Sequence, residues 1–248
     1  TYHKIDPKPE LGLTCIHPKI FEKQIKFLVA KGYRFSTISK LPDNPAVQRT
    51  IAISFDDGYK DISAYALPLL AKLGIPATVF IITDFIGLDN RWDVNLGGIH
   101  YPHLSVNDIR DLHQSGWEIG SHSLSHRSLR GLMQNELIRQ IGDSKNRLEE
   151  LIAEPVRCFA PPFGNVSPRI IDAALHCGYQ KICGFYPLKY YDSAVSEYLV
   201  LRLAVYRSDS RRAILAKLSA NRHLYYEVFK QNIINFCSNA TVIVNSLR

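Results

Sequence analysis

The stretch Ile51-Ala-Ile-Ser-Phe-Asp-Asp-Gly58 joins a short apolar run directly to two adjacent carboxylates and a glycine. The run is bounded by polar residues and is typical of a buried strand, so Asp56 and Asp57 are expected at a strand end. Gly58 allows a sharp turn there. Two neighbouring carboxylates repel each other unless a cation or a proton shares the site. The alternative is a solvated turn, because Asp-Asp-Gly is also ordinary turn chemistry.

Strand and helix patterns alternate along the rest of the chain. Short apolar runs predict strands over residues 50–54, 77–82, 117–120, 156–160, 180–183, 199–205 and 241–244. Helical spacing predicts helices over 20–29, 64–73, 105–114, 134–151, 167–178, 211–218 and 225–236. Ser105 and Asp108 form a capping-box pattern, and Ser167 followed by Pro168 marks another helix start. The alternation indicates parallel strands linked by crossover helices, and about seven or eight strands favour a barrel over an open sheet.

In such folds the chemistry lies at the carboxyl ends of the strands, and a second polar group follows the predicted strand 117–120. It is His122-Ser-Leu-Ser-His126. Two histidines at i and i+4 face the same side of a helical turn and can bind one metal ion, although with nine histidines in the chain such a pair can also arise by chance. Ser123 stands where zincin metalloproteases need Glu, so that class is disfavoured. Two imidazoles and one carboxylate leave an open position on zinc, as in catalytic sites.

A third segment, Phe159-Ala-Pro-Pro-Phe-Gly164, also follows a predicted strand. Two prolines and a glycine stiffen the backbone without supplying a functional side chain. Such a loop can point a backbone N–H at a developing oxyanion, or it can be a rigid turn and nothing more.

These three segments, in this order and at strand ends, resemble the polysaccharide deacetylases, which are carbohydrate esterase family 4 with the nodulation-protein-B homology domain. The likeness runs from Tyr2 to about Leu218 and includes the stretch from Leu67 to Phe80. It implies a distorted (β/α)7 barrel and a divalent metal, usually Zn²⁺, with Co²⁺ or Ni²⁺ as alternatives. By this resemblance the metal ligands are Asp57, His122 and His126. Asp56 would be the general base, and the backbone N–H of Phe163 would help to hold the oxyanion.

The chain departs from the family pattern at two positions. Many members take the general acid from a C-terminal histidine, where this chain has Asn245. Members that begin Tyr-His-x-Ile, such as poly-N-acetylglucosamine deacetylases, resemble a permuted arrangement in which the N-terminal histidine is the acid, and this implies His3. Many members also place Arg where Ala160 stands. Alternation along a strand points Arg157 to the opposite face from Ala160, so Arg202 is the candidate for orienting Asp56.

Substrate contacts are expected from the loops beside the site. Trp92 lies in a long polar loop over residues 84–103 and could stack on a sugar ring or simply anchor the loop. Pro161 and Pro162 are further candidates. His100 and His103 could flank the cleft, but we interpret them as surface loop residues.

Composition sets the remaining expectations. The 248 residues are 46% hydrophobic and 21% charged, which favours one globular domain over residues 1–248 with no membrane span. The net charge of +7 mildly favours an anionic or phosphate-bearing substrate, and the saccharide could be lipid-linked. No basic stripe with interleaved aromatics indicates nucleic-acid binding. Five cysteines without a CxxC pattern suggest reduced thiols. They favour the cytoplasm or the cytoplasmic side of a membrane, and an exported form whose signal has been removed stays open.

The resemblance therefore implies an enzyme that hydrolyses an N-acyl group, most simply acetyl, from an amino sugar of a polysaccharide, a lipopolysaccharide or a lipid-linked saccharide. The alternative is a catalytically impaired carbohydrate-binding protein on the same scaffold, which Asn245 and Ala160 suggest.

Overall fold

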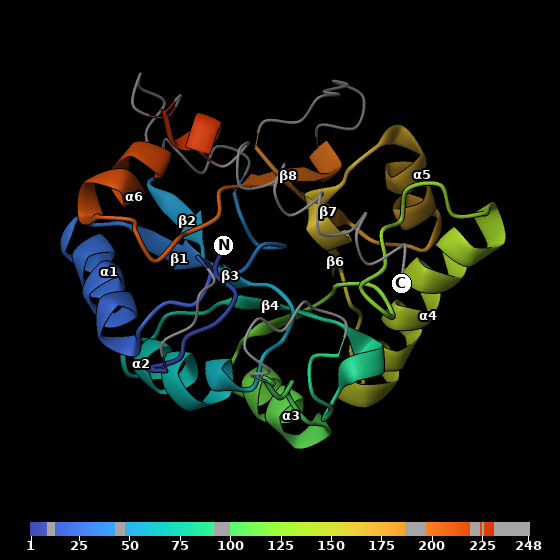
Figure 1. Ribbon diagram of the computed structural model, residues 1–248, viewed down its shortest axis with the longest axis horizontal. Coiled ribbons are helices and arrows are strands. Elements are labelled where there is room, and N and C mark those ends of the chain that lie inside the picture. The colour runs from blue at the N-terminus through green and yellow to red at the C-terminus, as the bar shows by residue number, and fades with distance from the viewer. Residues whose placement is uncertain are drawn as a thin grey trace.

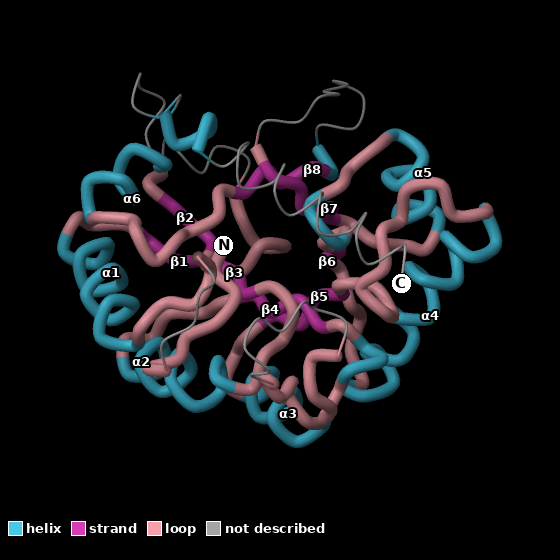
Figure 2. Tube along the Cα trace, in the orientation of Figure 1, coloured by secondary structure: helices cyan, strands magenta, loops and turns pink. Residues whose placement is uncertain are grey.

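The computed structural model describes residues 1–8, 13–42, 48–91, 100–186, 197–218, 224 and 226–230. Its centre is a parallel sheet whose strands are hydrogen-bonded in chain order, curled inside a ring of helices (Figure 1, Figure 2). These strands are β3 (Ser54–Phe55), β4 (Thr78–Ile81), β5 (Glu118–Ser121), β6 (Cys158–Phe159), β7 (Lys181–Phe185) and β8 (Leu199–Arg202). A separate parallel pair is formed by β1 (Arg34–Ser36) and β2 (Thr50–Ala52). The sequence did not predict β1.

Helices follow the strands, as the alternating pattern predicted. They are α1 (Pro18–Ala30), α2 (Leu67–Lys72), α3 (Val106–Gln114), α4 (Gln134–Ile152), α5 (Pro168–His176) and α6 (Arg211–Leu218). A π-helical turn over Ile62–Ala66 precedes α2, and 3₁₀ turns cover Thr83–Phe85 and Pro162–Gly164. Both predicted caps are present: Ser105 and Asp108 form a capping box, and the Ser167 hydroxyl accepts from the Ile170 N–H. None of the helices in the described ranges is long and apolar enough to cross a membrane.

The N-terminal residues close the curled sheet between its two edge strands. On one side, the Tyr2 N–H donates to the Ser54 carbonyl (2.8 Å), and the Asp56 N–H donates to the Tyr2 carbonyl (2.9 Å). On the other side, the Val205 N–H donates to the Thr1 carbonyl at 2.8 Å, just after β8. The segment therefore bridges β3 and the chain just after β8, and it satisfies backbone groups on both sides. It also carries His3 to the carboxyl end of β3.

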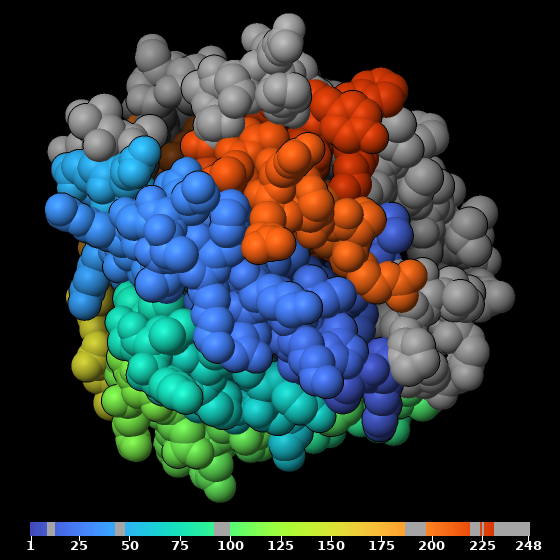
Figure 3. Space-filling model, turned by 90° about the vertical axis from the view of Figure 1, so that its left-hand side faces the viewer, coloured from blue at the N-terminus to red at the C-terminus, as the bar shows by residue number. Residues whose placement is uncertain are grey.

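The apolar core lies between the sheet and the helices. In α1 the buried side chains are Phe21, Gln24, Ile25 and Leu28, and the Phe21 ring packs on Phe55 of β3 at 5.9 Å between centroids. Two other members of the predicted apolar stripe are exposed: Ile20 at 37% and Val29 at 42%. The buried face is thus narrower than the sequence suggested. Figure 3 shows α1 and α6 side by side on one face of the molecule.

Two predicted elements near the C-terminus lie wholly or partly outside the described residues. The expected strand 241–244 lies outside the described residues. Of the expected helix 225–236, residues 226–230 are helical. The cysteines within the described ranges are free thiols: Cys15, Cys158, Cys177 and Cys183. Three of these four are buried, as expected for small apolar side chains.

Candidate active site

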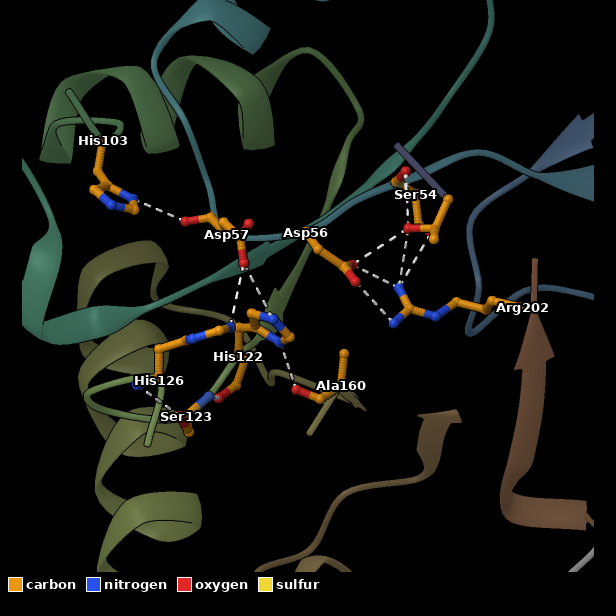
Figure 4. A network of polar contacts seen from close by, with 11 residues as sticks. Ser54, Asp56, Asp57, His103, His122, Ser123, His126, Ala160 and Arg202 are labelled. Atoms are coloured by element: carbon orange, nitrogen blue, oxygen red, sulfur yellow. Dashed lines mark hydrogen bonds and ion pairs between the residues drawn. The ribbon is translucent and has the colours of Figure 1, made fainter. Parts of the chain in front are cut away.

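Residues singled out in the sequence converge at the carboxyl edge of the sheet (Figure 4). They come from segments far apart in the chain but placed side by side by the parallel strand order. The residues that meet there are Asp56 and Asp57 after β3, His122 and His126 after β5, Ala160 and Phe163 after β6, and Arg202 at the end of β8.

Asp57, His122 and His126 form a buried cluster with the spacing of a metal site. One ligand atom from each lies within 4.8 Å of the other two. The Nε2 atoms of His122 and His126 lie 3.3 Å and 3.4 Å from Asp57 Oδ1. One carboxylate and two imidazoles are a donor set that Zn²⁺ accepts while keeping a position open. The predicted ligand residues therefore fit a divalent cation in both spacing and chemistry.

A backbone carbonyl fixes the orientation of His122. Its Nδ1 lies 2.6 Å from the Ala160 carbonyl oxygen, which can only accept, so Nδ1 carries the proton. Nε2 is then the atom with a lone pair directed at the cluster. This arrangement, with one ring nitrogen donating to a carbonyl, is typical of metal-binding histidines. Ala160 contributes through its backbone, and no side chain is needed there for this contact.

The two histidines do not share a helical turn, so that expectation was wrong. Ser123 and His126 have φ values of 69° and 56°, in the left-handed region. Serine side chains support this tight loop: the Ser121 hydroxyl accepts from the Ser123 N–H at 3.2 Å, and the Ser123 hydroxyl accepts from the His126 N–H at 3.3 Å. Hydroxyls that bond to nearby backbone groups compete with helix formation and favour such turns.

Asp57 also adopts a left-handed conformation, with φ of 69°, followed by Gly58 at the same φ. The His103 ring supports this turn, because its Nδ1 lies 2.9 Å from the Asp57 carbonyl oxygen. His103 is only 3% exposed. Our interpretation of His103 as a surface loop residue was therefore wrong, while His100 is exposed as expected. The Asn90–His103 stretch offered no local pattern by which the burial of one histidine could be recognised.

The charges of the cluster suit a cation. Burial would raise the pKa of Asp57, but the hydrogen bond and charge of the histidines outweigh burial and lower it. Burial lowers the pKa of His126 to about 3, so this imidazole is neutral. At His122 burial is outweighed by the Asp57 and Asp56 carboxylates, and the pKa is raised. A cation competes with that proton, which makes metal affinity depend on pH.

Asp56 is held by a two-point ion pair with Arg202. Nη1 lies 2.6 Å from Oδ1, and Nη2 lies 3.0 Å from Oδ2. Both residues are buried. Burial alone would raise the pKa of Asp56, but the Arg202 guanidinium is the main group that holds it below its ordinary value. The sequence-based candidate for orienting Asp56 is thus confirmed, and Arg202 supplies the guanidinium missing at Ala160.

His3 lies beside this pair. The backbone bonds of Tyr2 place it next to Asp56, and the charges of Asp57, Asp56 and His122 all act on its pKa. Its Nδ1 is buried and makes no hydrogen bond within the described part of the chain. The N-terminal histidine therefore lies among the candidate site residues and not at a frayed end, and its role stays a prediction.

The Pro161–Gly164 loop lies against the histidines. The Phe163 ring packs on His126 with 4.7 Å between centroids, and Phe163 has φ of 60°. Gly164 has φ of 63°, and a Cβ there would lie 2.1 Å from the Phe185 ring, so only glycine fits. Pro161 and Pro162 are buried. Their contact with a substrate, like the oxyanion role of the Phe163 N–H, stays a prediction.

Two residues named from the sequence lie outside the described residues: Trp92 and Asn245. Arg157 is exposed and Ala160 is buried, which is consistent with the expectation that the two side chains point to opposite faces.

Comparison with known proteins shows the family to which the sequence is similar. The family model described as polysaccharide deacetylase matches residues 43–182, more than half of the chain. The match includes Asp56, Asp57, His122, His126 and Phe163, but His3 and Arg202 lie outside it. A Bacillus subtilis protein, YxkH, whose name places it among the polysaccharide deacetylases, is 29% identical over 184 residues. This alignment covers 72% of this chain and 61% of that protein.

A poly-beta-1,6-N-acetyl-D-glucosamine N-deacetylase of Staphylococcus aureus is 27% identical over 176 residues, which cover 64% of this chain and 58% of that enzyme. The chain thus spans about three fifths of the length of these relatives. Among solved structures, the Streptococcus pyogenes deacetylase PplD is similar with a TM-score of 0.73 at 20% sequence identity. The alignment covers 88% of this chain and 96% of the PplD chain. IcaB from Ammonifex degensii is similar with a TM-score of 0.72, also at 20% identity. This alignment covers 88% of this chain and 95% of the IcaB chain.

These structural likenesses confirm the predicted distorted (β/α)7-type barrel. The family assignment rests on the sequence match over residues 43–182, and the fold is consistent with it. The chain belongs to the polysaccharide deacetylase family.

Proposed function

We propose that this protein is a metal-dependent hydrolase that removes N-acetyl groups from amino sugars of a polysaccharide. The observation that carries the proposal is the buried Asp56–Arg202 pair beside the Asp57, His122 and His126 cluster. Hydrolysis of an amide needs a general base and an electrophile, and an oriented, ionised carboxylate next to a cation site can provide both. The Staphylococcus aureus relative is named for a β-1,6-linked N-acetylglucosamine polymer, which supports that polymer as the first substrate to test.

Asp57, His122 and His126 would hold the cation, and we propose Zn²⁺ because this donor set suits it. A bound cation of this kind supplies Lewis acidity toward the amide carbonyl and lowers the pKa of water. Asp56, kept ionised and aimed by Arg202, accepts the proton of the attacking water. The Phe163 N–H donates a hydrogen bond to the oxyanion. His3 gives a proton to the nitrogen as the C–N bond breaks, so the products are acetate and a free amine.

The carbohydrate-binding alternative loses one of its two supports, while Asn245 lies outside the described residues. Ala160 suggested that the orienting arginine was missing, but Arg202 provides a buried two-point contact to Asp56 instead. A protein that only binds sugar has no need of this ion pair beside a cluster of metal ligands.

The direct test is release of acetate and free amine from β-1,6-linked N-acetylglucosamine oligomers by the Zn²⁺-loaded protein. We expect turnover by the wild type and none above background by Asp56→Asn. N-formylated and β-1,4-linked oligomers, assayed in parallel, define the acyl group and the linkage. A wild type no more active than Asp56→Asn on every N-acylated sugar would contradict the proposal.

Replacing Arg202 by Met should shift the pH dependence of the reaction. Without the guanidinium, burial raises the pKa of Asp56, so the ionised base forms only at higher pH. The acidic limb of the kcat/KM profile therefore moves to higher pH, and activity at low pH is lost first. Arg147→Met, which removes a surface ion pair with Asp84, is the matched control and should leave the profile in place. An unmoved profile in Arg202→Met would refute its role toward Asp56.

Replacing His3 by Ala should lower kcat for amide substrates by about 10²–10⁴-fold, the usual contribution of a general acid. The metal content should not change, because His3 is outside the ligand cluster. Burial lowers the pKa of His3, so the proton-donating form should decline as pH rises through that lowered value. An aryl acetate ester provides the sharp comparison, since its leaving group needs no proton. His3→Ala should retain activity on the ester, and equal losses on amide and ester would exclude the acid role.

A further inference from the structure

The five-residue turn after β3, Asp57–Asp61, holds the N-terminal segment at a second place, beyond its pairing with β3. The Asp61 Oδ2 atom accepts the backbone N–H of Ile5. Asp61 Oδ1 is shielded from solvent and makes no hydrogen bond within the described part of the chain. The Ile5 N–H is thus the donor that links this carboxyl group to the N-terminal segment, and the Ile62 N–H bonds to it from the following turn.

The backbone of the sheet cannot provide this contact. The segment pairs with β3 at Tyr2, but β3 ends at Phe55 and the chain then turns. At Lys4 the segment no longer pairs with β3. It pairs with Cys15 instead, and the Lys4 carbonyl accepts the Ile16 N–H at 2.9 Å. Without Asp61, the Ile5 N–H would be buried away from any strand that could accept it, and a buried donor left unpaired is costly.

The same turn also holds the residue before Ile5. Lys4 is 4% exposed, and its ammonium lies 5.1 Å from the centroid of the Tyr59 ring and 4.3 Å from that of Tyr101. The Tyr59 ring in turn stacks on His103 at 4.9 Å, and His103 supports the Asp57 carbonyl. A continuous set of contacts therefore joins the residue after His3 to the residue that carries a metal ligand.

We propose that Asp61 is a positioning residue of the reaction: by tethering Ile5 it fixes His3 relative to Asp56 and the metal ligands. The proposal rests on the function proposed above, in which His3 donates the proton. His3 is two residues from the tether on one side and adjacent to Tyr2, which is bonded to β3, on the other. Loss of the tether would leave the segment after His3 held by the Lys4 contacts without the Asp61 bond to Ile5. Misplacement of a reacting group by about 1 Å can cost about 10²-fold in rate.

Asparagine is the conservative replacement. Burial raises the pKa of Asp61 to about 7, and either protonation state offers an oxygen that can accept from the Ile5 N–H. The amide oxygen of Asn can do the same at nearly the same position. Asp61→Asn should therefore keep the tether, whereas Asp61→Ala removes it.

The experiment measures kcat, KM, metal content and amide hydrogen exchange for Asp61→Ala, Asp61→Asn, His3→Ala and the double variant of His3 and Asp61 to Ala. We expect Asp61→Ala to lower kcat by about 10–100-fold with KM and metal content nearly unchanged, and Asp61→Asn to restore most of the rate. In the His3→Ala background the Asp61→Ala change should add less than about twofold, because both act through the same proton. Exchange at the Ile5 amide should rise in Asp61→Ala and in the double variant, but not in Asp61→Asn or His3→Ala.

Asp108→Ala is the matched control. Its carboxylate also accepts a backbone N–H, that of Ser105 at 2.8 Å, but it does so in a helix cap away from the site. This variant should lower thermal stability and leave kcat unchanged. A loss in Asp61→Ala that multiplies fully with that of His3→Ala, or wild-type kcat in a folded Asp61→Ala, would overturn the proposal. Unchanged exchange at Ile5 would also overturn it. Failure of the proposed function looks different, because no variant, nor the wild type, would then release acetate.

Discussion

Asp56→Asn should lower kcat for acetate release by about 10³-fold or more, the upper range for loss of a general base. Asn keeps the size of the side chain and one oxygen for Arg202, but it cannot accept a proton at neutral pH. The ligand cluster does not include Asp56, so the variant should bind metal like the wild type. The measurement is single-turnover acetate release at saturating oligomer, together with metal content. This separates loss of chemistry from loss of the site.

Asp84→Asn provides the control for this substitution. It removes a carboxylate of the same type that pairs with Arg147 at the surface, and exposed pairs contribute little. Its rate should stay within about twofold of the wild type. If Asp56→Asn kept a rate close to that of Asp84→Asn, the assignment of the base would be wrong.

His126→Ala should abolish both activity and the stabilisation that metal gives. The imidazole is neutral and buried, with Nε2 3.4 Å from Asp57 Oδ1, so its removal leaves two ligands for the cation. For the wild type, Zn²⁺ should raise the thermal midpoint in proportion to the logarithm of its concentration above Kd, and chelation should reverse the effect. For His126→Ala the midpoint should not respond at the same concentrations.

His113→Ala tests whether the loss is specific to this histidine. His113 lies on α3 next to the exposed Glu154, outside the cluster. Its variant should respond to Zn²⁺ and to chelation as the wild type does. Equal Zn²⁺ responses in His126→Ala and His113→Ala would contradict the ligand assignment.

The convergence of Asp57 and His122 could be predicted because each lies just after a recognisable strand, whereas their role as ligands is implied by the family resemblance. Parallel strand order brings strand ends to one edge of the sheet, so Asp57 and His122 meet although 65 residues separate them in the sequence. The local conformation of the loop could not be read in the same way. Spacing at i and i+4 suggested a helix, but serine hydroxyls favour the left-handed turn that places His126.

Other parts of the site depend on contacts that no local pattern encodes. Arg202 reaches Asp56 across 146 residues, and it could only be a candidate from its place in a strand. The burial of His103 follows from the packing of its ring on Tyr59, within a loop that carries no periodic signal. The closure of the sheet by Thr1 and Tyr2 involves too few residues for hydrophobic periodicity to show a strand.

The central claim is that Asp57, His122 and His126 bind one cation. Calorimetric titration of the chelator-treated wild type with Zn²⁺ tests it most directly, alongside Asp57→Ala and His122→Ala. The predicted result is one Zn²⁺ bound per chain by the wild type and none by either variant at the same concentrations. A wild type that binds no Zn²⁺, Co²⁺ or Ni²⁺, or variants that bind Zn²⁺ as tightly as the wild type does, would contradict the account.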